Sequence, residues 1–323
     1  MSGSGEDDLI ARHFAPWAAP GGLGLRDDAA LVAPGAGEEL VVTADALVAG
    51  VHFHPDDPPE TVAKKALRVN LSDLAAKGAE PRGFLLALAL PKADAGDWLA
   101  RFAQGLREDA AAFRIGLLGG DTVSTPGPAM IAITAIGAVP TGRMVRRSGA
   151  RPGDAIYVTG TIGDAALGLS LHRSPERFAT LGAQERAHLA DRYLLPKPRV
   201  GATGTLRRVA SAAMDVSDGL VGDVIKLCSA SGVTARIALA DVPLSDAARA
   251  VLRADVTLFE TVVTGGDDYE ILFTSSSRTL AADAFGGVIF TRIGFVEEGR
   301  APARFSALDG AETAFKHGNF SHF

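Results

Sequence analysis

Residues 59–90, PETVAKKALRVNLSDLAAKGAEPRGFLLALAL, contain the pattern that decides the fold class. The part from Pro59 to Lys77 has the spacing of an amphipathic helix. Its apolar stripe consists of Ala63, Leu67 and Leu74. The part from Gly83 to Leu90 is a short apolar run, which is typical of a buried strand. A helix followed directly by a strand predicts a fold that mixes α and β elements.

The same alternation of strand and helix patterns continues on both sides of this stretch. Strands are predicted over residues 39–43, 115–118, 129–139, 155–159, 210–214 and 234–239. Helices are predicted over residues 95–113, 163–171 and 220–230. A hairpin-like pair of strands is predicted at residues 260–263 and 269–274. The whole chain is therefore predicted to have an α/β (α+β) fold.

The length of the chain predicts two domains. It has 323 residues, and single hydrophobic cores stop growing at about 250–300 residues. The segment 140–153, PTGRMVRRSGARPG, is rich in Pro, Gly and Arg and has no apolar period, so it suits a domain junction. We predict an N-terminal domain over residues 1–145 and a C-terminal domain over residues 146–323.

Composition and charge narrow the class of protein. Hydrophobic residues make up 47% of the chain and charged residues 22%, which is typical of a globular protein with a large core. The net charge of −6 argues against a nucleic-acid surface, because binding a phosphate backbone requires clustered Lys and Arg. The start of the chain is acidic, and the longest apolar run covers only residues 84–90. Neither a secretion signal nor a membrane span is predicted, so we expect a cytoplasmic protein.

The single cysteine, Cys228, excludes a disulfide within the chain and any metal site made of several cysteines. It falls within the apolar pattern of a predicted helix. We therefore predict that this thiol packs in the core and takes no part in covalent chemistry.

Aspartates recur where apolar runs of strand type end. Asp45, Asp121 and Asp215 each follow such a run. The pairs Asp27–Asp28 and Asp267–Asp268 lie beside glycine-rich stretches. Any one aspartate can simply cap a helix or stabilise a turn, but ligands also gather at strand ends in α/β sheets. If these side chains converge, each pair at about 4 Å repels by about 4 kcal/mol at an effective dielectric near 20, so the cluster requires divalent cations.

Asp73 supports this hypothesis from helical geometry. In the predicted helix over residues 59–77 it lies on a face beside the apolar stripe, together with Asn70 and Lys77. A carboxylate beside a buried stripe needs a partner, because burying an unpaired charge is costly. A metal ion and Lys77 are equally good candidates for that partner.

The kinds of residue present indicate a hard metal ion and a polyphosphate. Carboxylate oxygens, together with backbone amides at Gly119 and Gly120, suit Mg²⁺ bound with phosphate groups, and phosphoryl transfer is the reaction this favours. No GxxxxGK[ST] motif is present, and the stretch 160–164, GTIGD, is better explained as a tight turn between a strand and a helix. His52 and His54 are as consistent with ordinary polar residues as with ligands.

The motifs occur in an order that is typical of one known family. In chain order they are DDAAL (27–31), TADALVAGVHF (43–53), VNLSDLAAKGAEP (69–81), GGDT (119–122), RSGARPGD (147–154), MDVSDGL (214–220), GGDDYEILFT (265–274) and HGNFSHF (317–323). This ordered set closely resembles the thiamine-monophosphate kinase family and covers essentially the whole chain.

The resemblance implies the two-domain fold of the aminoimidazole-ribonucleotide-synthetase superfamily, in which the N-terminal halves of two subunits form a shared β-barrel. It implies transfer of a phosphoryl group from ATP to thiamine monophosphate, with several Mg²⁺ ions and a homodimer. The positions that match the magnesium ligands are Asp28, Thr43, Asp45, Asp73, Asp121, Asp215 and Asp218. The positions that match the ATP contacts are Gly120, Asp121, Arg147 and Ser217. The positions that match the thiamine contacts are His52, Asp267 and Phe320.

Two positions depart from the family pattern, and two other functions stay open. Arg26 stands where the family usually has Gly, and Ala44 stands where it has a second hydroxyl residue. An aminoimidazole ribonucleotide synthetase is the alternative enzyme, although the motifs VHF and GGDDYE count against it. A catalytically silent module that binds nucleotide and metal is the alternative from another class, and the full set of aspartates counts against it.

Overall fold

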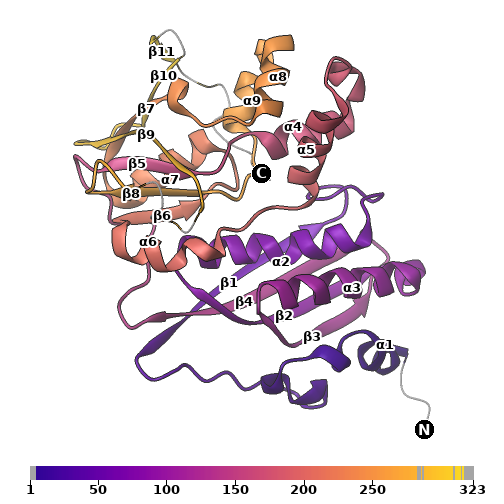
Figure 1. The fold of residues 1–323 in the computed structure, drawn as a ribbon. Coiled ribbons are helices and arrows are strands. Elements are labelled where there is room, and N and C mark those ends of the chain that lie inside the picture. Colours follow the sequence, from indigo (N-terminus) through magenta and orange to yellow (C-terminus); the bar gives the residue numbers. More distant parts are fainter. Residues whose placement is uncertain (1–4, 282–284, 286, 308–309, 314, 316–323) are drawn as a thin grey trace. The chain divides into compact units, whose positions relative to one another are not determined.

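The computed structural model describes all residues except 1–4, 282–284, 286, 308–309, 314 and 316–323. The chain forms two compact units (Figure 1). The first unit contains Met1–Leu74 and Ala79–Gly142, and the second contains Ala75–Gly78 and Arg143–Phe323. Each unit combines helices with one sheet, so the predicted α/β class is confirmed.

The first unit is built on a four-stranded sheet with the strand order β1-β4-β2-β3. Its strands are β1 (Glu38–Val48), β2 (Glu80–Leu90), β3 (Gly116–Ser124) and β4 (Met130–Pro140). Strand β4 is antiparallel to both of its neighbours, whereas β2 and β3 are parallel. Helices α2 (Pro59–Ala76) and α3 (Asp97–Ala112) lie against one face of this sheet, and α1 (Gly5–His13) precedes it in the chain (Figure 1).

The two faces of this sheet differ in burial. On β1, Val41 and Leu47 are buried, while Leu40 and Val42 on the alternate face are 37% and 61% exposed. On β2, Leu85 is likewise 37% exposed. Since alternate residues of a strand point to opposite faces, the sheet buries one face under its helices and presents apolar side chains on the other.

The second unit is built on a seven-stranded mixed sheet with the order β11-β10-β7-β9-β5-β8-β6. Its strands are β5 (Ala155–Thr159), β6 (Ala212–Asp215), β7 (Thr234–Ala238), β8 (Ile271–Ser275), β9 (Phe290–Glu297), β10 (Arg304–Ser306) and β11 (Glu312–Thr313). Its helices are α4 (Asp164–Arg173), α5 (Ala183–Leu194), α6 (Thr203–Val209), α7 (Leu220–Ser231), α8 (Asp246–Ala254) and α9 (Phe259–Thr264).

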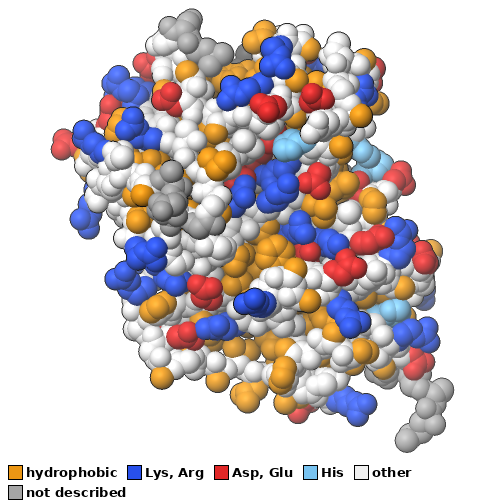
Figure 2. All heavy atoms as spheres, in the orientation of Figure 1, with side chains coloured by type: hydrophobic (Ala, Val, Ile, Leu, Met, Phe, Trp, Pro, Cys, Tyr) orange, Lys and Arg blue, Asp and Glu red, His pale blue; other side chains and the backbone are white. Residues whose placement is uncertain are grey.

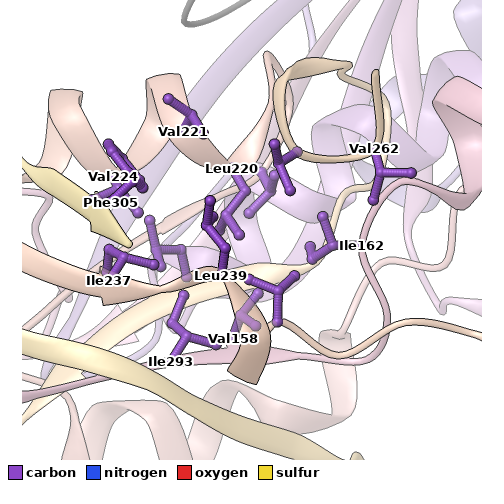
Figure 3. Close-up of a cluster of buried hydrophobic side chains, with 14 of the residues drawn as sticks. Val158, Ile162, Leu220, Val221, Val224, Ile237, Leu239, Val262, Ile293 and Phe305 are labelled. Carbon is purple, nitrogen blue, oxygen red and sulfur yellow. The ribbon is translucent and has the colours of Figure 1, made fainter. Parts of the chain in front are cut away.

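Strand β5 divides two hydrophobic cores in this unit. Ile156 and Val158 belong to one core, which Figure 3 shows together with side chains from α7, α9 and β9. Ala155 and Tyr157 belong to the other, which also includes Ala75 and Ala76. The end of α2 therefore packs in the second unit, because its two alanines are part of that unit's core.

The hairpin predicted at residues 260–263 and 269–274 is wrong in its first half. Residues 259–264 form helix α9, and β8 pairs with β5 and β6 instead. The run TVVT is rich in β-branched residues, which favours a strand in isolation. Packing favours the helix, because Val262 and Val263 are completely buried in it. In addition, Thr264 Oγ1 donates to the carbonyl of Glu260 at 2.7 Å.

The molecular surface carries charges of both signs. Figure 2 shows Lys and Arg side chains interspersed with Asp and Glu over the face in view. Within the part of the chain that the structure describes, no helix combines the length and the apolar character that a membrane crossing requires.

Cys228 packs as predicted, and we expect it to be chemically inert. Its side chain is 2% exposed in the core of the second unit, and burial raises the pKa of its thiol to about 11. At pH 8 about one thiol in a thousand is then ionised, so iodoacetamide should label the native protein far more slowly than the unfolded chain. Cys228→Ala should lower the free energy of unfolding by about 1–2 kcal/mol and leave turnover unchanged. Complete inactivation of a folded Cys228→Ala variant would contradict this assignment.

Candidate functional site

The first unit contains a cavity of about 510 Å³ that brings predicted site residues together. It is lined by Ile10 of α1 and the following Phe14, by residues between Gly22 and Val32, and by residues of β2, β3 and β4. Asp27, Asp28 and Asp121 all line it, as does Gly120. Three carboxylates and a glycine-rich wall in one cavity suit a ligand that carries phosphate groups and a cation.

The backbone around this cavity has unusual conformations. Gly120 has φ +153°, and a Cβ built on it would lie 1.7 Å from the carbonyl oxygen of Leu86, so only glycine fits this position of β3. Leu23 and Leu25 have φ angles of +52° and +55°, which residues other than glycine rarely adopt. Such strained residues cluster at ligand sites, and here they lie just before the paired aspartates.

Thr43 and Asp73 form a second group in the same unit. Thr43 lies on β1 and Asp73 on α2, and the Thr43 hydroxyl donates to Asp73 Oδ2 at 2.5 Å. Lys77, one of the two partners left open for Asp73, donates to the carbonyl of Ala213 at 2.8 Å. The hydroxyl is a third kind of partner, which the helical pattern alone did not reveal.

Asp45 and Asp121 lie within strands and not beyond their ends, which corrects the sequence analysis. Asp45 is opposite Ile133 of β4, Ile133 is opposite Leu86 of β2, and Leu86 is opposite Gly120 of β3. The two aspartates are thus at opposite edges of the sheet, about 14 Å apart at about 4.8 Å per strand. One ion cannot be bound by both within one chain. Among the described residues, no three His, Cys, Asp or Glu side chains are close enough to hold a metal ion.

His52 lies in the turn that follows β1. Its Nδ1 accepts the backbone amide of Val48 at 3.0 Å, and its carbonyl oxygen accepts from Lys65 Nζ at 3.1 Å. Because Nδ1 is the acceptor, the neutral ring carries its proton on Nε2. The Nε2 nitrogen of His52 is therefore a hydrogen-bond donor.

In the second unit, two segments that carry predicted site residues are paired through their backbones. The amide of Asp267 donates to the carbonyl of Ser217 at 2.9 Å, and the amide of Tyr269 donates to the carbonyl of Val216 at 2.8 Å. Asp215, which is buried, ends the strand β6 just before this pairing. The motifs MDVSDGL and GGDDYE therefore form one structural element, although about fifty residues separate them in the sequence.

Two residues of α7 that the sequence analysis did not single out organise this element. Asp223 is completely buried, and its Oδ2 accepts the amides of Ser217 and Asp218, both at 3.1 Å. Lys226 Nζ donates to Asp223 Oδ1 at 2.9 Å and also to Asp218 Oδ2. Burial raises the pKa of Asp223, against the effect of the Lys226 hydrogen bond. An acidic residue inside the apolar pattern of a helix was the signal that could have identified Asp223.

The other predicted positions are distributed as follows. Arg147 is exposed in the segment that precedes β5, and its carbonyl accepts from Ser231 Oγ at 3.3 Å. The stretch 160–164 connects β5 to α4 as a turn, as predicted, and the amide of Gly163 donates to Asp268 Oδ2 at 2.8 Å. A protein carboxylate thus occupies the place that a phosphate would take at this helix start. Phe320 lies outside the described residues.

Comparison with known proteins gives a consistent result. The chain matches the AIR synthase related protein family, with the N-terminal domain over residues 26–139 and the C-terminal domain over residues 151–284. It is 43% identical to the thiamine-monophosphate kinase of Caulobacter vibrioides, over 93% of this chain and 86% of the relative. The structure is similar to that of thiamine-monophosphate kinase from Stenotrophomonas maltophilia, with a TM-score of 0.80 and 39% identity over 90% of this chain and 91% of that one. It is also similar to AaThiL complexed with AMPPCP and TMP, with a TM-score of 0.78 and 30% identity over 98% of this chain and 94% of that one.

Proposed function

We infer that this chain, which belongs to the thiamine-monophosphate kinase family, transfers the γ-phosphoryl group of ATP to thiamine monophosphate and releases thiamine diphosphate and ADP. The observation that carries the proposal is the similarity over 98% of this chain to AaThiL, which was solved with AMPPCP and TMP bound. Because ATP is the donor, we propose that the reaction takes place in the cytoplasm.

The donor side of the reaction is assigned to oxygen ligands and backbone amides. In the first unit we propose Asp28, Thr43, Asp45, Asp73 and Asp121 as magnesium ligands. In the second unit we propose Asp215 and Asp218. Magnesium bound by such groups keeps several waters, recruits phosphate oxygens and neutralises the repulsion between two phosphates. It therefore does not require three protein side chains to be assembled in advance, and none are among the residues that the structure describes. Gly120, Arg147 and Ser217 are proposed as contacts to ATP, where the Arg147 guanidinium would pair with phosphate oxygens.

The acceptor side needs no general base. The phosphate of thiamine monophosphate is already ionised at neutral pH, so its oxygen can attack without losing a proton to the protein. We propose that His52 and Asp267 contact the thiamine portion, with Nε2 of His52 as a hydrogen-bond donor. Phe320 is proposed to stack on the thiamine rings, where the permanent thiazolium charge favours an aromatic face. Positioning and charge neutralisation then supply the catalysis, as in other phosphoryl transfers.

The direct test measures ADP and thiamine diphosphate after incubation of the purified chain with ATP and magnesium. Thiamine monophosphate should be converted, whereas thiamine should fail, because its alcohol must lose a proton and no residue is assigned to accept it. Formation of thiamine monophosphate from thiamine, without diphosphate from the monophosphate, would refute the acceptor assignment. Absence of ADP formation with thiamine monophosphate would favour a silent module or an aminoimidazole ribonucleotide synthetase.

We also propose that two copies associate through the apolar face of the four-stranded sheet and form a shared barrel. The exposed Leu40, Val42 and Leu85 support this, since apolar side chains gathered on one sheet face mark an interaction surface. Val42→Asp should then give a monomer in size-exclusion chromatography with light scattering. Val256→Asp is the matched control, because Val256 is 65% exposed in the second unit. A monomeric wild-type chain would contradict the proposal.

A further inference from the structure

The segment from Gly265 to Glu270 alternates between buried and accessible side chains without being a strand. Asp268 and Glu270 are completely buried, whereas Asp267 and Tyr269 are partly exposed. Asp267 and Tyr269 have φ of +69° and +51°, in the left-handed region that non-glycine residues rarely adopt. This conformation persists only if the surrounding structure enforces it.

Close backbone contact with Val216 and Ser217 is the first restraint on this segment. The segment bonds to Val216 and Ser217 through the amides of Tyr269 and Asp267. A Cβ built on Gly266 would lie 2.2 Å from the carbonyl oxygen of Ser217, so the two segments approach as closely as glycine allows. These contacts set the distance between the segments, and the Tyr269 hydroxyl donates to Asp267 Oδ1 at 3.3 Å.

Hydrogen bonds and ion pairs between buried residues are the second restraint on this segment. Glu270 accepts from Thr159 Oγ1 at 2.7 Å, from Arg199 Nε at 2.6 Å, and from Arg192 Nη2 at 3.1 Å. The same Nη2 of Arg192 donates to the carbonyl of Asp268 at 3.0 Å. Arg192 is 3% exposed, so one buried guanidinium joins two residues of the segment. Because lysine is shorter than arginine, a lysine ammonium at this position would not reach both acceptors from the place that Nη2 occupies.

Asp268 ties the same segment to the start of α4. Its Oδ2 accepts the amide of Gly163 at 2.8 Å. Burial raises the pKa of Asp268 well above its ordinary value, against the effects of the Gly163 amide and of Arg192. Asp267, the residue between the glycines and this anchor, is thus held between two fixed neighbours.

We propose that Arg192, Asp268 and Glu270 are positioning residues, which hold Asp267 in its left-handed conformation for contact with the acceptor. They touch neither ATP nor the acceptor and act only through Asp267. This inference rests on the proposed function, because the contact of Asp267 with thiamine monophosphate belongs to that proposal. It gives a role to Arg192, which lies outside the sequence motifs, and to Glu270, and it assigns Asp268 to positioning instead of to a cation.

The test is a double-mutant cycle between Arg192→Lys and Asp267→Gly. Arg192→Lys keeps the charge and loses the bridge, so the KM for thiamine monophosphate should rise at least tenfold while the KM for ATP stays within about twofold. Asp267→Gly removes the acceptor contact without backbone strain. If Arg192 acts through Asp267, the double variant should have the same acceptor KM as Asp267→Gly alone. Multiplicative effects, or an equal rise in the KM for ATP, would overturn the proposal.

A matched control and an alternative variant complete this test. Arg177→Lys is the matched control, because Arg177 forms an exposed ion pair with Asp255 at 2.7 Å in the same unit, and it should change neither KM. If Arg192→Lys does not fold, Thr159→Val removes the hydroxyl that donates to Glu270 Oε2 and accepts the amide of Ile271 at 2.8 Å, and it leaves every charge in place. Its acceptor KM should rise, without further effect in an Asp267→Gly background.

The final arm is independent of the reaction. Hydrogen exchange at the amides of Asp267 and Tyr269 should be faster in Arg192→Lys, or in Thr159→Val, than in the wild-type chain. If the wild-type chain does not phosphorylate thiamine monophosphate, the proposed function fails, yet faster exchange would still support a role in holding the segment. Unchanged exchange at both amides would overturn the positioning role whatever the activity.

Discussion

Asp121→Asn should lower kcat for thiamine diphosphate formation by at least about 100-fold, the scale on which loss of one stabilising group acts in other enzymes. Asp121 is exposed in the cavity that it shares with Asp27 and Asp28. The substitution keeps the shape of the side chain and removes its negative charge. Since the residue contributes no packing, the free energy of unfolding should change by less than about 0.5 kcal/mol.

The matched control for this substitution is Asp56→Asn. The Asp56 side chain is 88% exposed in the same unit, lies 3.6 Å from His54, and has no assigned role. It should retain full turnover. In Asp121→Asn, the magnesium concentration that gives half-maximal activity should rise, because one ligand charge is lost. Wild-type turnover and an unchanged magnesium requirement in Asp121→Asn would refute the metal assignment.

Local patterns predicted helices α2, α3, α4 and α7 and most of the strands that the structure describes, because these patterns depend on residues close in the sequence. The apolar stripe of residues 59–77 became α2 (Pro59–Ala76), and the run at 83–90 became part of β2. The strand predicted at residues 260–263 is wrong. Its β-branched residues favour a strand, but burial of Val262 and Val263 favours the helix, and burial prevailed. Local propensity is the weaker influence when a short segment packs against a core.

The arrangement of the site depends on strand order, which no local pattern contains. Asp45 and Asp121 both follow apolar runs, so the sequence suggested that they converge. The order β1-β4-β2-β3 instead places their strands at opposite edges. The sequence also did not reveal the hydrogen-bond partners of single residues. The sequence identified Asp73 and Asp218, but not the hydroxyl of Thr43 as the partner of one or Lys226 as the partner of the other.

The pairing of MDVSDGL with GGDDYE shows why the motifs were still informative. Their members were recognised as a set, although the contacts between them arise from tertiary structure. Backbone bonds from Asp267 and Tyr269 to Ser217 and Val216 join the two motifs. Each motif therefore carries residues that face a ligand and residues that fix the other motif, and only the structure separates the two kinds.

The acceptor assignment predicts a selective defect in Asp267→Ala. The value of kcat/KM for thiamine monophosphate should fall by about 10–150-fold, which corresponds to the loss of about 1.5–3 kcal/mol from a hydrogen bond to a charged group. The KM for ATP should stay within about twofold, because the proposed contact of Asp267 is with the thiamine portion. Steady-state kinetics with each substrate varied in turn would measure both values.

Backbone strain is the competing explanation for such a defect, and a second variant separates the two. Asp267 has φ +69°, a conformation that costs alanine about 1–2 kcal/mol and glycine almost nothing. If the carboxylate contacts the acceptor, Asp267→Gly should lose as much activity with thiamine monophosphate as Asp267→Ala, although it should be the more stable of the two. Near wild-type kinetics in Asp267→Gly would show that the backbone, and not the carboxylate, was responsible, and the assignment of Asp267 to the acceptor would then be wrong.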